Sequence, residues 1–318
     1  MKAFITGGAG FIASNLADRL LQLDHSVVVY DNFSTGQRKF IEHNLQNKNY
    51  KLITADVLDK PTLTKAMQNA DIVFHFQANA DVRGGMENTQ IDVEQNITGT
   101  HNVLEAMKIN RIDRIAFASS ATVYGEPEVI PTPEDIAPVQ TSLYGASKFA
   151  AEALIQAYCE YFDMHSWIFR FVSFMGPRYT HGVIFDFMRK LKKDPTTLHI
   201  LGDGSQRKSY LHVNDGINAI LAAIEKTKEK TNIFNLGNKE WINVTDLADI
   251  LCETLQIQDV KYEFAGGIRG WKGDTPFVHL DISKIRALGW EPEYSVKDTI
   301  IKTVNYLSDN EELLFARS

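Results

Sequence analysis

The chain has 318 residues, enough for about two domains with a sizeable hydrophobic core. Hydrophobic residues make up 44% and charged residues 23%, which is ordinary for a globular protein that folds in water. The net charge of −7 excludes a global basic field that would attract nucleic acid or anionic lipid. We therefore expect no nucleic-acid partner. No apolar run approaches a membrane span, so we also expect no membrane association.

The two cysteines, Cys159 and Cys252, form neither a metal-binding spacing nor a disulfide framework. Both fall in helical patterns, so we expect buried thiols, no metal and a reducing compartment. The first apolar run begins at once and is interrupted by Gly7, which argues against a signal peptide. The expected location is therefore the cytoplasm.

The first residues of the chain carry its strongest local pattern. Residues 2–6 form an apolar run typical of a buried strand, residues 7–13 form a glycine-rich turn, and residues 14–23 have helical apolar spacing. Glycines let a backbone approach phosphate groups, and a helix N-terminus offers N–H groups and the positive end of a dipole. A strand, a glycine turn and a helix together predict a pyrophosphate cradle.

Apolar, β-rich runs then alternate with helical patterns through the first half of the chain. The runs lie at residues 26–30, 50–54, 72–76, 115–118 and 167–171. Such strands separated by helices predict a parallel sheet covered on both faces. We expect an α/β fold with a Rossmann-type doubly wound sheet over residues 1–171. Residues 172–318 are expected to form a smaller α/β substrate domain, with some of its segments packing back on the first.

Two acidic residues follow strands at positions that suit an adenosine group. Asp31 lies about twenty residues beyond the glycine turn, where a carboxylate binds ribose hydroxyls and repels a 2′-phosphate. This position favours NAD over NADP, although a turn-forming role in Asp31-Asn32 is the simpler alternative. Asp56 follows the third strand and either bonds the adenine amine or caps the next turn.

The fourth expected strand and the helical pattern after it suggest one supporting residue. The pattern runs from about Asn88 to Ile109, with Asn96 in its middle. We expect Asn96 to bond the neighbouring backbone and to hold the active-site loop, the alternative being solvent exposure. His75 is expected to pack or hydrogen-bond inside the sheet rather than to react.

A reactive constellation follows in the middle of the chain. Ser120 ends the fifth expected strand, and Tyr144 and Lys148 lie four residues apart on one face of the next helix. An ammonium near a tyrosine hydroxyl favours the phenolate, so we expect the Tyr144 pKa to fall from about 10 toward neutrality. Tyr144 is then a general acid and base, and Ser120 bonds the same substrate hydroxyl.

In combination these motifs resemble the extended short-chain dehydrogenase/reductases, in particular the NAD-dependent sugar-nucleotide epimerase/dehydratase family. The matching segments are Thr6-Gly7-Gly8-Ala9-Gly10-Phe11-Ile12, Asp31-Asn32, Ser119-Ser120-Ala121-Thr122-Val123-Tyr124-Gly125 and Tyr144 with Lys148. The resemblance implies an enzyme with a catalytic triad of Ser120, Tyr144 and Lys148. It also implies that NAD is bound by Gly7, Gly10, Phe11, Ile12, Asp31, Asn32, Asp56, Val57, Gln77, Asn96, Tyr144 and Lys148.

The resemblance narrows the reaction without fixing it. Ala121 and Thr122 stand where family dehydratases have an Asp-Glu pair and decarboxylases a Glu, which argues against both reactions. The segment is instead similar to that of UDP-glucose 4-epimerases. We therefore expect oxidation at C4 of a nucleoside-diphosphate sugar with return of the hydride, and this makes the chain an isomerase. A 4-dehydrogenase, for example of a GDP-heptose, is the alternative, and a non-catalytic NAD-binding scaffold is a remote one.

The second half departs more from the family. Ser173 replaces an Asn that contacts substrate phosphate, and Lys208 replaces an Arg. Lysine binds phosphate as a point charge without the arginine fork. The resemblance implies substrate contacts from Ser173, Arg178, Arg207, Lys208, Arg269 and Asp274. It also implies a homodimer formed by the helices near 88–109 and after Tyr144, and a role in polysaccharide biosynthesis.

Overall fold

The computed structural model describes residues 1–315, which form two compact units. The first unit comprises residues 1–125, 134–171 and 217–235. The second comprises residues 126–133, 172–216 and the chain from 236 onward. The expected boundary at residue 171 therefore holds except for two segments: residues 126–133 belong to the second unit, and residues 217–235 belong to the first.

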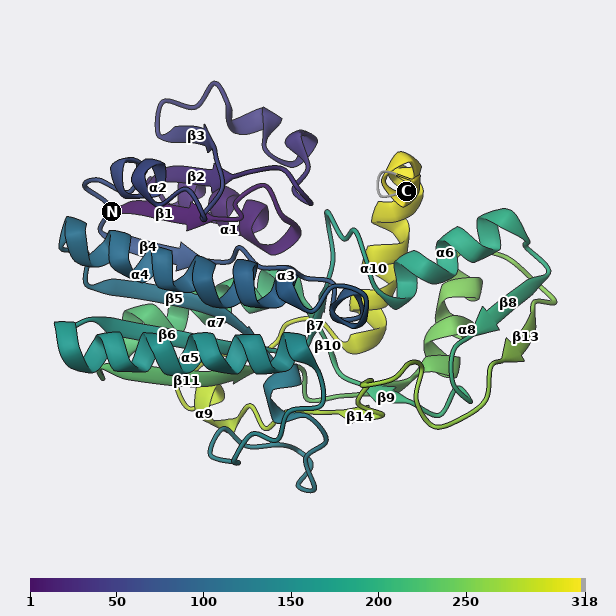
Figure 1. Cartoon of the computed structure of the whole chain (residues 1–318). Coiled ribbons are helices and arrows are strands. Elements are labelled where there is room, and N and C mark those ends of the chain that lie inside the picture. Colours follow the sequence, from purple (N-terminus) through teal and green to yellow (C-terminus); the bar gives the residue numbers. More distant parts are fainter. Residues whose placement is uncertain (316–318) are drawn as a thin grey trace. The chain divides into compact units, whose positions relative to one another are not determined.

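A seven-stranded sheet forms the centre of the first unit (Figure 1), in the order β11-β6-β5-β4-β1-β2-β3. From β3 across to β6, every neighbouring pair is parallel. The order reverses between β1 and β4, and ligands of such sheets bind at the carboxyl ends of the strands beside this reversal. The predicted doubly wound sheet is confirmed. The strands are β1 (Lys2–Thr6), β2 (Ser26–Asp31), β3 (Tyr50–Thr54), β4 (Ile72–His75), β5 (Arg114–Ser120), β6 (His165–Phe171) and β11 (Thr231–Leu236).

Helices cover both faces of this sheet (Figure 1). On one face, α2 (Lys60–Ala66), α4 (Gly99–Asn110) and α5 (Leu143–Phe162) pack side chains such as Leu63, Leu104 and Ile155 onto strand residues such as Phe117. The other face carries α1 (Phe11–Gln22) and the part of α7 (Val213–Lys226) that belongs to this unit. The 3-10 turns of the unit are η1 (Arg38–Phe40), η2 (Glu42–Asn44), η3 (Gly84–Met86) and η5 (Ala121–Tyr124).

The helical pattern predicted from Asn88 to Ile109 is interrupted. It consists of α3 (Gln90–Asp92), a π-helical segment η4 (Val93–Thr98), and α4. A π-helical turn inserts one residue into the helical repeat and is frequent at functional sites. Asn96 lies within this turn and is buried.

Short sheets and helices make up the second unit. β7 (Ser173–Met175) pairs in parallel with β10 (Tyr210–His212), and β13 (Lys261–Phe264) pairs in parallel with β8 (Thr197–Ile200). A third sheet has the order β12 (Ile242–Asn243), β9 (Arg207–Lys208) and β14 (Phe277–Val278). The helices are α6 (Val183–Lys193), α8 (Val244–Thr254), α9 (Ser283–Arg286), α10 (Val296–Asp309) and the 3-10 segment η6 (Glu311–Phe315). No helix within residues 1–315 is long and apolar enough to cross a bilayer.

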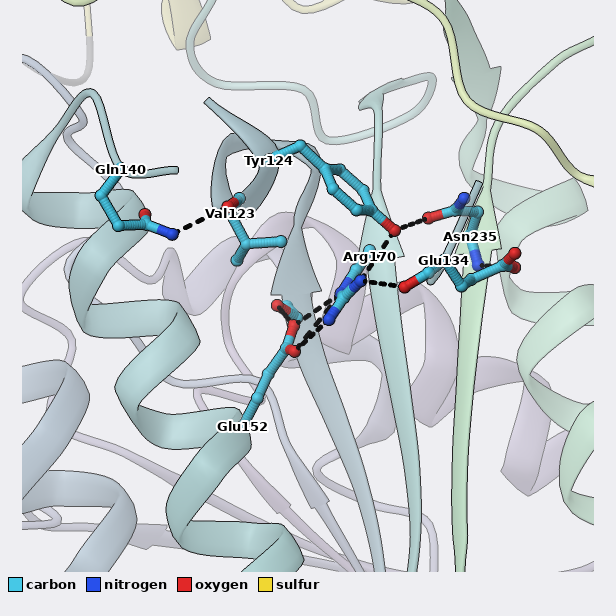
Figure 2. A network of polar contacts seen from close by, with 8 residues as sticks. Val123, Tyr124, Glu134, Gln140, Glu152, Arg170 and Asn235 are labelled. Atoms are coloured by element: carbon cyan, nitrogen blue, oxygen red, sulfur yellow. Dashed lines mark hydrogen bonds and ion pairs between the residues drawn. The ribbon is translucent and has the colours of Figure 1, made fainter. Parts of the chain in front are cut away.

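A buried polar network ties the elements of the first unit together (Figure 2). Glu152 of α5 accepts hydrogen bonds from Arg170 of β6, at 3.1 Å from Nε and 2.7 Å from Nη2. Arg170 Nη1 donates to the hydroxyl of Tyr124 at 2.8 Å and to the carbonyl of Glu134 at 2.9 Å. Tyr124 in turn donates to the Asn235 side chain at 2.7 Å. The Glu152–Arg170 pair thereby connects α5 and β6 to Tyr124 and to the loop at Glu134.

We expect Arg170→Met to lower the free energy of unfolding by about 3–5 kcal/mol, because it leaves the Glu152 carboxylate buried without its partner. The side chains of this pair are 4% and 0% exposed. Urea denaturation followed by circular dichroism measures the change.

Arg286→Met is the matched control, since Arg286 and Glu291 form an ion pair with exposed side chains. Exposed pairs contribute little to stability, so this variant should unfold close to the wild type. Equal losses in the two variants would contradict the assigned importance of the buried pair.

Candidate active site

The glycine turn after β1 has the geometry of a phosphate cradle. Gly7 has φ 68°, and a Cβ added there would lie 2.8 Å from the backbone N and Cα of Gln77. Gly10 precedes α1 and brings no capping side chain, so the first turn of the helix presents its backbone N–H groups and dipole toward the loop. A Cβ at Gly7 would collide with the Gln77 backbone, and a Cβ at Gly10 would lie 3.1 Å from the Gly7 carbonyl oxygen, so the tight turn needs glycine at both positions. The residues present therefore fit NAD.

A buried carboxylate adjoins this loop at the end of β2. Asp31 accepts hydrogen bonds from the N–H of Ala9 at 2.9 Å and of Phe33 at 2.7 Å. Burial raises the pKa of Asp31, and these two hydrogen bonds oppose the rise. The carboxylate thus lies where the sequence predicts an adenosine contact, and it also fixes the end of the glycine turn.

Asp56 has partners that match the turn interpretation of its role. It accepts hydrogen bonds from the Leu58 N–H at 2.8 Å and from Asn32 Nδ2 at 2.7 Å. The adjacent Val57 is buried, and its carbonyl accepts a hydrogen bond from Asn102. Asp56 and Asn32 therefore lie together at the carboxyl ends of β2 and β3.

Asn96 holds the chain that follows β4. Its Oδ1 accepts a hydrogen bond from the Asn79 N–H at 2.8 Å, and its Nδ2 donates to Ser147 Oγ at 2.8 Å. These bonds confirm that Asn96 joins the loop after β4 to α5. Nearby, Gln77 donates to Gln95 at 2.8 Å, and its backbone closes over Gly7.

Tyr144 and Lys148 lie one turn apart near the start of α5. Ser142 caps this helix by accepting a hydrogen bond from the Gly145 N–H at 3.0 Å, which places Tyr144 in the first turn. The buried Lys148 ammonium donates to the carbonyl of Ala118 at 2.8 Å and lies 5.9 Å from the Tyr144 ring centroid. Ser120, at the end of β5, accepts hydrogen bonds from the Thr122 N–H at 3.2 Å and hydroxyl at 2.9 Å, and its proximity lowers the pKa of Tyr144.

The proton affinities of this pair differ from the prediction. The Tyr144 pKa is raised, mainly by burial and also by the charge of Asp92, while the hydrogen bond with Ser120 lowers it. Burial lowers the pKa of Lys148 to about 7, against the opposing charges of Glu152 and Asp92. The prediction that Lys148 lowers the Tyr144 pKa toward neutrality is therefore wrong: the protein alone raises this pKa. Loss of hydration raises the Tyr144 pKa, and because burial also lowers the Lys148 pKa to about 7, less positive charge is present to oppose that rise.

The role expected for His75 is confirmed. Its ring is fully buried and hydrogen-bonded to the hydroxyls of Thr6 at 2.7 Å and Thr100 at 2.9 Å. Burial and the charge of Lys148 lower its pKa to about 3, so the ring is neutral at physiological pH. His75 joins β1, β4 and α4 and has no place in proton transfer.

Sequence reasoning missed two charged residues beside the site. Glu152 follows Lys148 by four residues on α5, and its carboxylate accepts hydrogen bonds from Arg170 and Ser119. Asp92 precedes Asn96 by four residues and accepts a hydrogen bond from it at 3.2 Å. The available signal was the spacing in the sequence: each acid lies four residues from a predicted site residue and therefore on the same face of the helix, one turn away.

The basic residues predicted to bind substrate lie in the second unit, where several have partners. Lys208 lies 2.8 Å from the Asp274 carboxylate, and Arg269 lies 2.7 Å from Glu126. The Arg207 guanidinium lies 5.2 Å from the ring centroids of both Trp241 and Phe277. The structure thus brings Lys208 and Asp274 together and gives Arg207 an aromatic environment. Ser173 is exposed at the start of β7, and Arg178 has φ 72°.

Comparisons with known proteins agree with this geometry. The pattern of the NAD dependent epimerase/dehydratase family matches residues 3–237. A putative UDP-glucose 4-epimerase of Methanocaldococcus jannaschii is 34% identical, over 96% of this chain and 98% of that protein. A crystal structure of a UDP-galactose 4-epimerase superposes with a TM-score of 0.88 at 35% identity, covering 98% and 99% of the two chains. The UDP-glucuronic acid 4-epimerase of Bacillus cereus, solved with UDP-glucuronic acid and NAD, gives 0.89 at 29% identity and covers 98% and 100%.

We expect Gly7→Ala to abolish most NAD binding, because the added Cβ meets the Gln77 backbone and the residue must keep a positive φ. The readouts are the NAD released per chain on denaturation and the heat of NAD titration.

Gly267→Ala separates the effect of the added Cβ contact from the effect of the positive φ. Gly267 has φ 79°, but a Cβ there would meet nothing within 4 Å. This variant should keep NAD at the wild-type level, and circular dichroism checks that both variants fold. If Gly7→Ala retained as much NAD as Gly267→Ala, the assignment of the cradle would be wrong.

Proposed function

The chain belongs to the NAD-dependent epimerase/dehydratase family, and on this premise we propose that it is an NAD-dependent 4-epimerase of a nucleoside-diphosphate sugar. The observation that carries the proposal is the placement of Ser120, Tyr144 and Lys148. They gather at the carboxyl end of β5 and on α5, in the same sheet whose first strand leads into the glycine cradle. This arrangement supports our proposal of an acid–base group beside a dinucleotide site.

We assign the NAD contacts to the carboxyl ends of the first four strands and to α5. Gly7, Gly10, Phe11 and Ile12 would hold the pyrophosphate, and Asp31 and Asn32 the adenosine ribose. The remaining contacts are assigned to Asp56, Val57, Gln77, Asn96, Tyr144 and Lys148. When bound there, NAD supplies a reversible hydride acceptor for C4 of the sugar.

Tyr144 carries the proton in this proposal. In the reactive state Tyr144 is a phenolate, which the positive charges of Lys148 and of bound NAD would support against the burial of the ring. Its Oη takes the proton of the sugar C4 hydroxyl as that carbon would pass a hydride to NAD, and Ser120 Oγ orients the same hydroxyl. The protein groups around Tyr144 raise its pKa, so the proton stays on Oη while the sugar turns over. The same oxygen then returns the proton to O4 as the reduced cofactor would return the hydride to the opposite face of C4, which restores the enzyme without loss of a proton to solvent. Lys148 bonds the ribose and supplies positive charge near Oη.

This cycle favours an epimerase over the alternatives. A 4-dehydrogenase must release the proton and the keto sugar, and it needs a separate oxidant for the reduced cofactor. The named relatives are 4-epimerases, which supports the closed cycle. A non-catalytic NAD-binding scaffold would need the glycine loop alone, without the three polar residues at β5 and α5.

We assign the substrate nucleotide to the second unit and NAD to the first. Lys208 and Asp274 are the best-placed pair, because a diphosphate would compete with the carboxylate for the ammonium. Ser173, Arg178, Arg207 and Arg269 are the further proposed contacts. The relatives named above carry UDP-glucose, UDP-galactose or UDP-glucuronic acid in their names, so UDP-sugars are the first substrates to test.

We also propose a cytoplasmic homodimer that supplies sugar donors for polysaccharide biosynthesis. Ile109 at the end of α4 and Tyr161 and Phe162 at the end of α5 are exposed apolar residues, which supports pairing through these two helices. Both cysteines are free thiols, which suits a reducing compartment.

We expect Tyr144→Phe to slow interconversion of UDP-glucose and UDP-galactose by about 10²–10⁴-fold, because it removes the proton-carrying oxygen. Proton NMR of the anomeric signals measures the rate, and denaturation measures the NAD retained.

Tyr161→Phe is the matched control on the same helix, since it removes a hydroxyl from a side chain that is 81% exposed and keeps the ring that we propose for pairing. It should keep the wild-type rate. Full turnover by Tyr144→Phe would remove Tyr144 from the mechanism, and net release of a keto sugar by the wild type would identify a dehydrogenase instead.

Lys208→Ala should raise the KM for the nucleotide sugar about tenfold with a smaller change in kcat, because a charged hydrogen bond to phosphate contributes about 1.5–3 kcal/mol. Steady-state kinetics measure both constants. Lys239→Ala, which removes an exposed lysine paired with Glu291, should leave KM unchanged. An unchanged KM in Lys208→Ala would exclude the proposed phosphate contact.

A further inference from the structure

Asp92 is a buried carboxylate that the proposed mechanism does not use. It ends α3 and is 1% exposed. Its Oδ1 accepts hydrogen bonds from Asn79 Nδ2 at 2.9 Å and Asn96 Nδ2 at 3.2 Å. Its Oδ2 is buried and has no hydrogen-bond partner among residues 1–315. A buried carboxylate oxygen without a donor is costly, so its retention calls for a reason.

The surrounding chain encloses this carboxylate and fixes it to α5. A Cβ added to Gly85 would lie 2.9 Å from Asp92 Oδ2, so glycine leaves the space that this oxygen occupies. Asn96 bonds both Asp92 and Ser147, the residue before Lys148. Asn96 of the π-helical turn thus links Asp92 to α5, the helix that carries Tyr144 and Lys148.

The charge of Asp92 acts on both members of that pair. It raises the pKa of Tyr144 and also that of Lys148, against the lowering by burial. Burial raises the pKa of Asp92 itself, while Asn79 and Lys148 lower it and Asp81 adds to the rise.

Lys148 has one other carboxylate near it, Glu152, and the neutral ring of His75 also faces it. Glu152 is already neutralised by the two-pronged contact with Arg170. Asp92 accepts only neutral amide donors, so its charge is the less compensated of the two.

We propose that Asp92 is a positioning residue whose buried negative charge keeps Lys148 protonated and holds the transferred proton on Tyr144. Proton transfer at the site is then controlled from α3 as well as from α5. The part that concerns the transferred proton rests on the proposed 4-epimerase function. The part that concerns Lys148 is a property of the folded chain and is testable without any substrate.

The first test measures the titration of Lys148 by NMR in the full chain labelled with [13Cε]lysine. The signal that disappears in Lys148→Arg identifies the residue, and the Lys148 pKa of about 7 lies in an accessible range. Asp92→Asn keeps the size of the side chain and an acceptor for Asn79 and Asn96. We expect it to lower the titration midpoint of Lys148 by about one pH unit, since an opposite charge nearby supports the ammonium.

Two matched variants separate charge from structure. Asn79→Ala removes one hydrogen bond to Asp92 but leaves the charge, and Asp81→Asn removes an exposed charge from the same loop. Both should leave the Lys148 midpoint near the wild-type value. If Asp92→Asn does not fold, Asp92→Ser takes its place. A midpoint equal to that of the wild type in the folded Asp92 variant would overturn the proposal.

The second test is the pH profile of UDP-glucose and UDP-galactose interconversion. Removal of the Asp92 charge makes both Tyr144 and Lys148 lose their protons at lower pH, so both limbs of the profile should move to lower pH. A residue that only anchors the loop would reduce the rate without moving the limbs, and that result would also overturn the proposal. A wild type without 4-epimerase activity would refute the proposed function, while the Lys148 titration still decides the role of Asp92.

Discussion

The ion pair of Glu152 and Arg170 is the constraint on which the site depends. It joins α5, which carries Tyr144 and Lys148, to β6 (Figure 2). The same carboxylate accepts a hydrogen bond from the hydroxyl of Ser119, the residue before Ser120. A buried pair of this kind gains little net stability, because desolvation offsets the attraction. Its value lies in position: the strand that carries Ser120 and the helix that carries Tyr144 are held to one carboxylate.

The same enclosure sets the protonation of the site. Burial lowers the pKa of Lys148 to about 7 and raises the pKa of Tyr144. Burial therefore favours the uncharged form of both side chains. A protein that returns its proton to the substrate benefits from a phenol with high proton affinity, since exchange with solvent would interrupt the cycle. Desolvation is therefore part of the chemistry rather than a cost that the fold merely tolerates.

Local patterns in the sequence predicted the strands, the glycine turn and the neighbourhood of Tyr144 and Lys148, because each depends on residues close in the chain. The Glu152–Arg170 pair joins residues 18 apart, and Lys208 and Asp274 are 66 apart, so no local pattern indicates either contact. The sign of the Tyr144 pKa shift failed for a related reason. It depends on how completely the folded chain removes water, which spacing on one helix does not reveal.

Reaction and substrate choice are separate physical problems in this chain. The reaction needs three polar groups fixed to about half an ångström, and the network beneath β5 and α5 provides that rigidity. Substrate binding needs charge that a diphosphate can reach, and here Lys208 lies beside Asp274 rather than in an open cluster. If Lys208 is the phosphate contact that we propose, a phosphate would have to displace the Asp274 carboxylate. That competition would disfavour weakly bound anions, and a diphosphate would overcome it although lysine lacks the fork of an arginine.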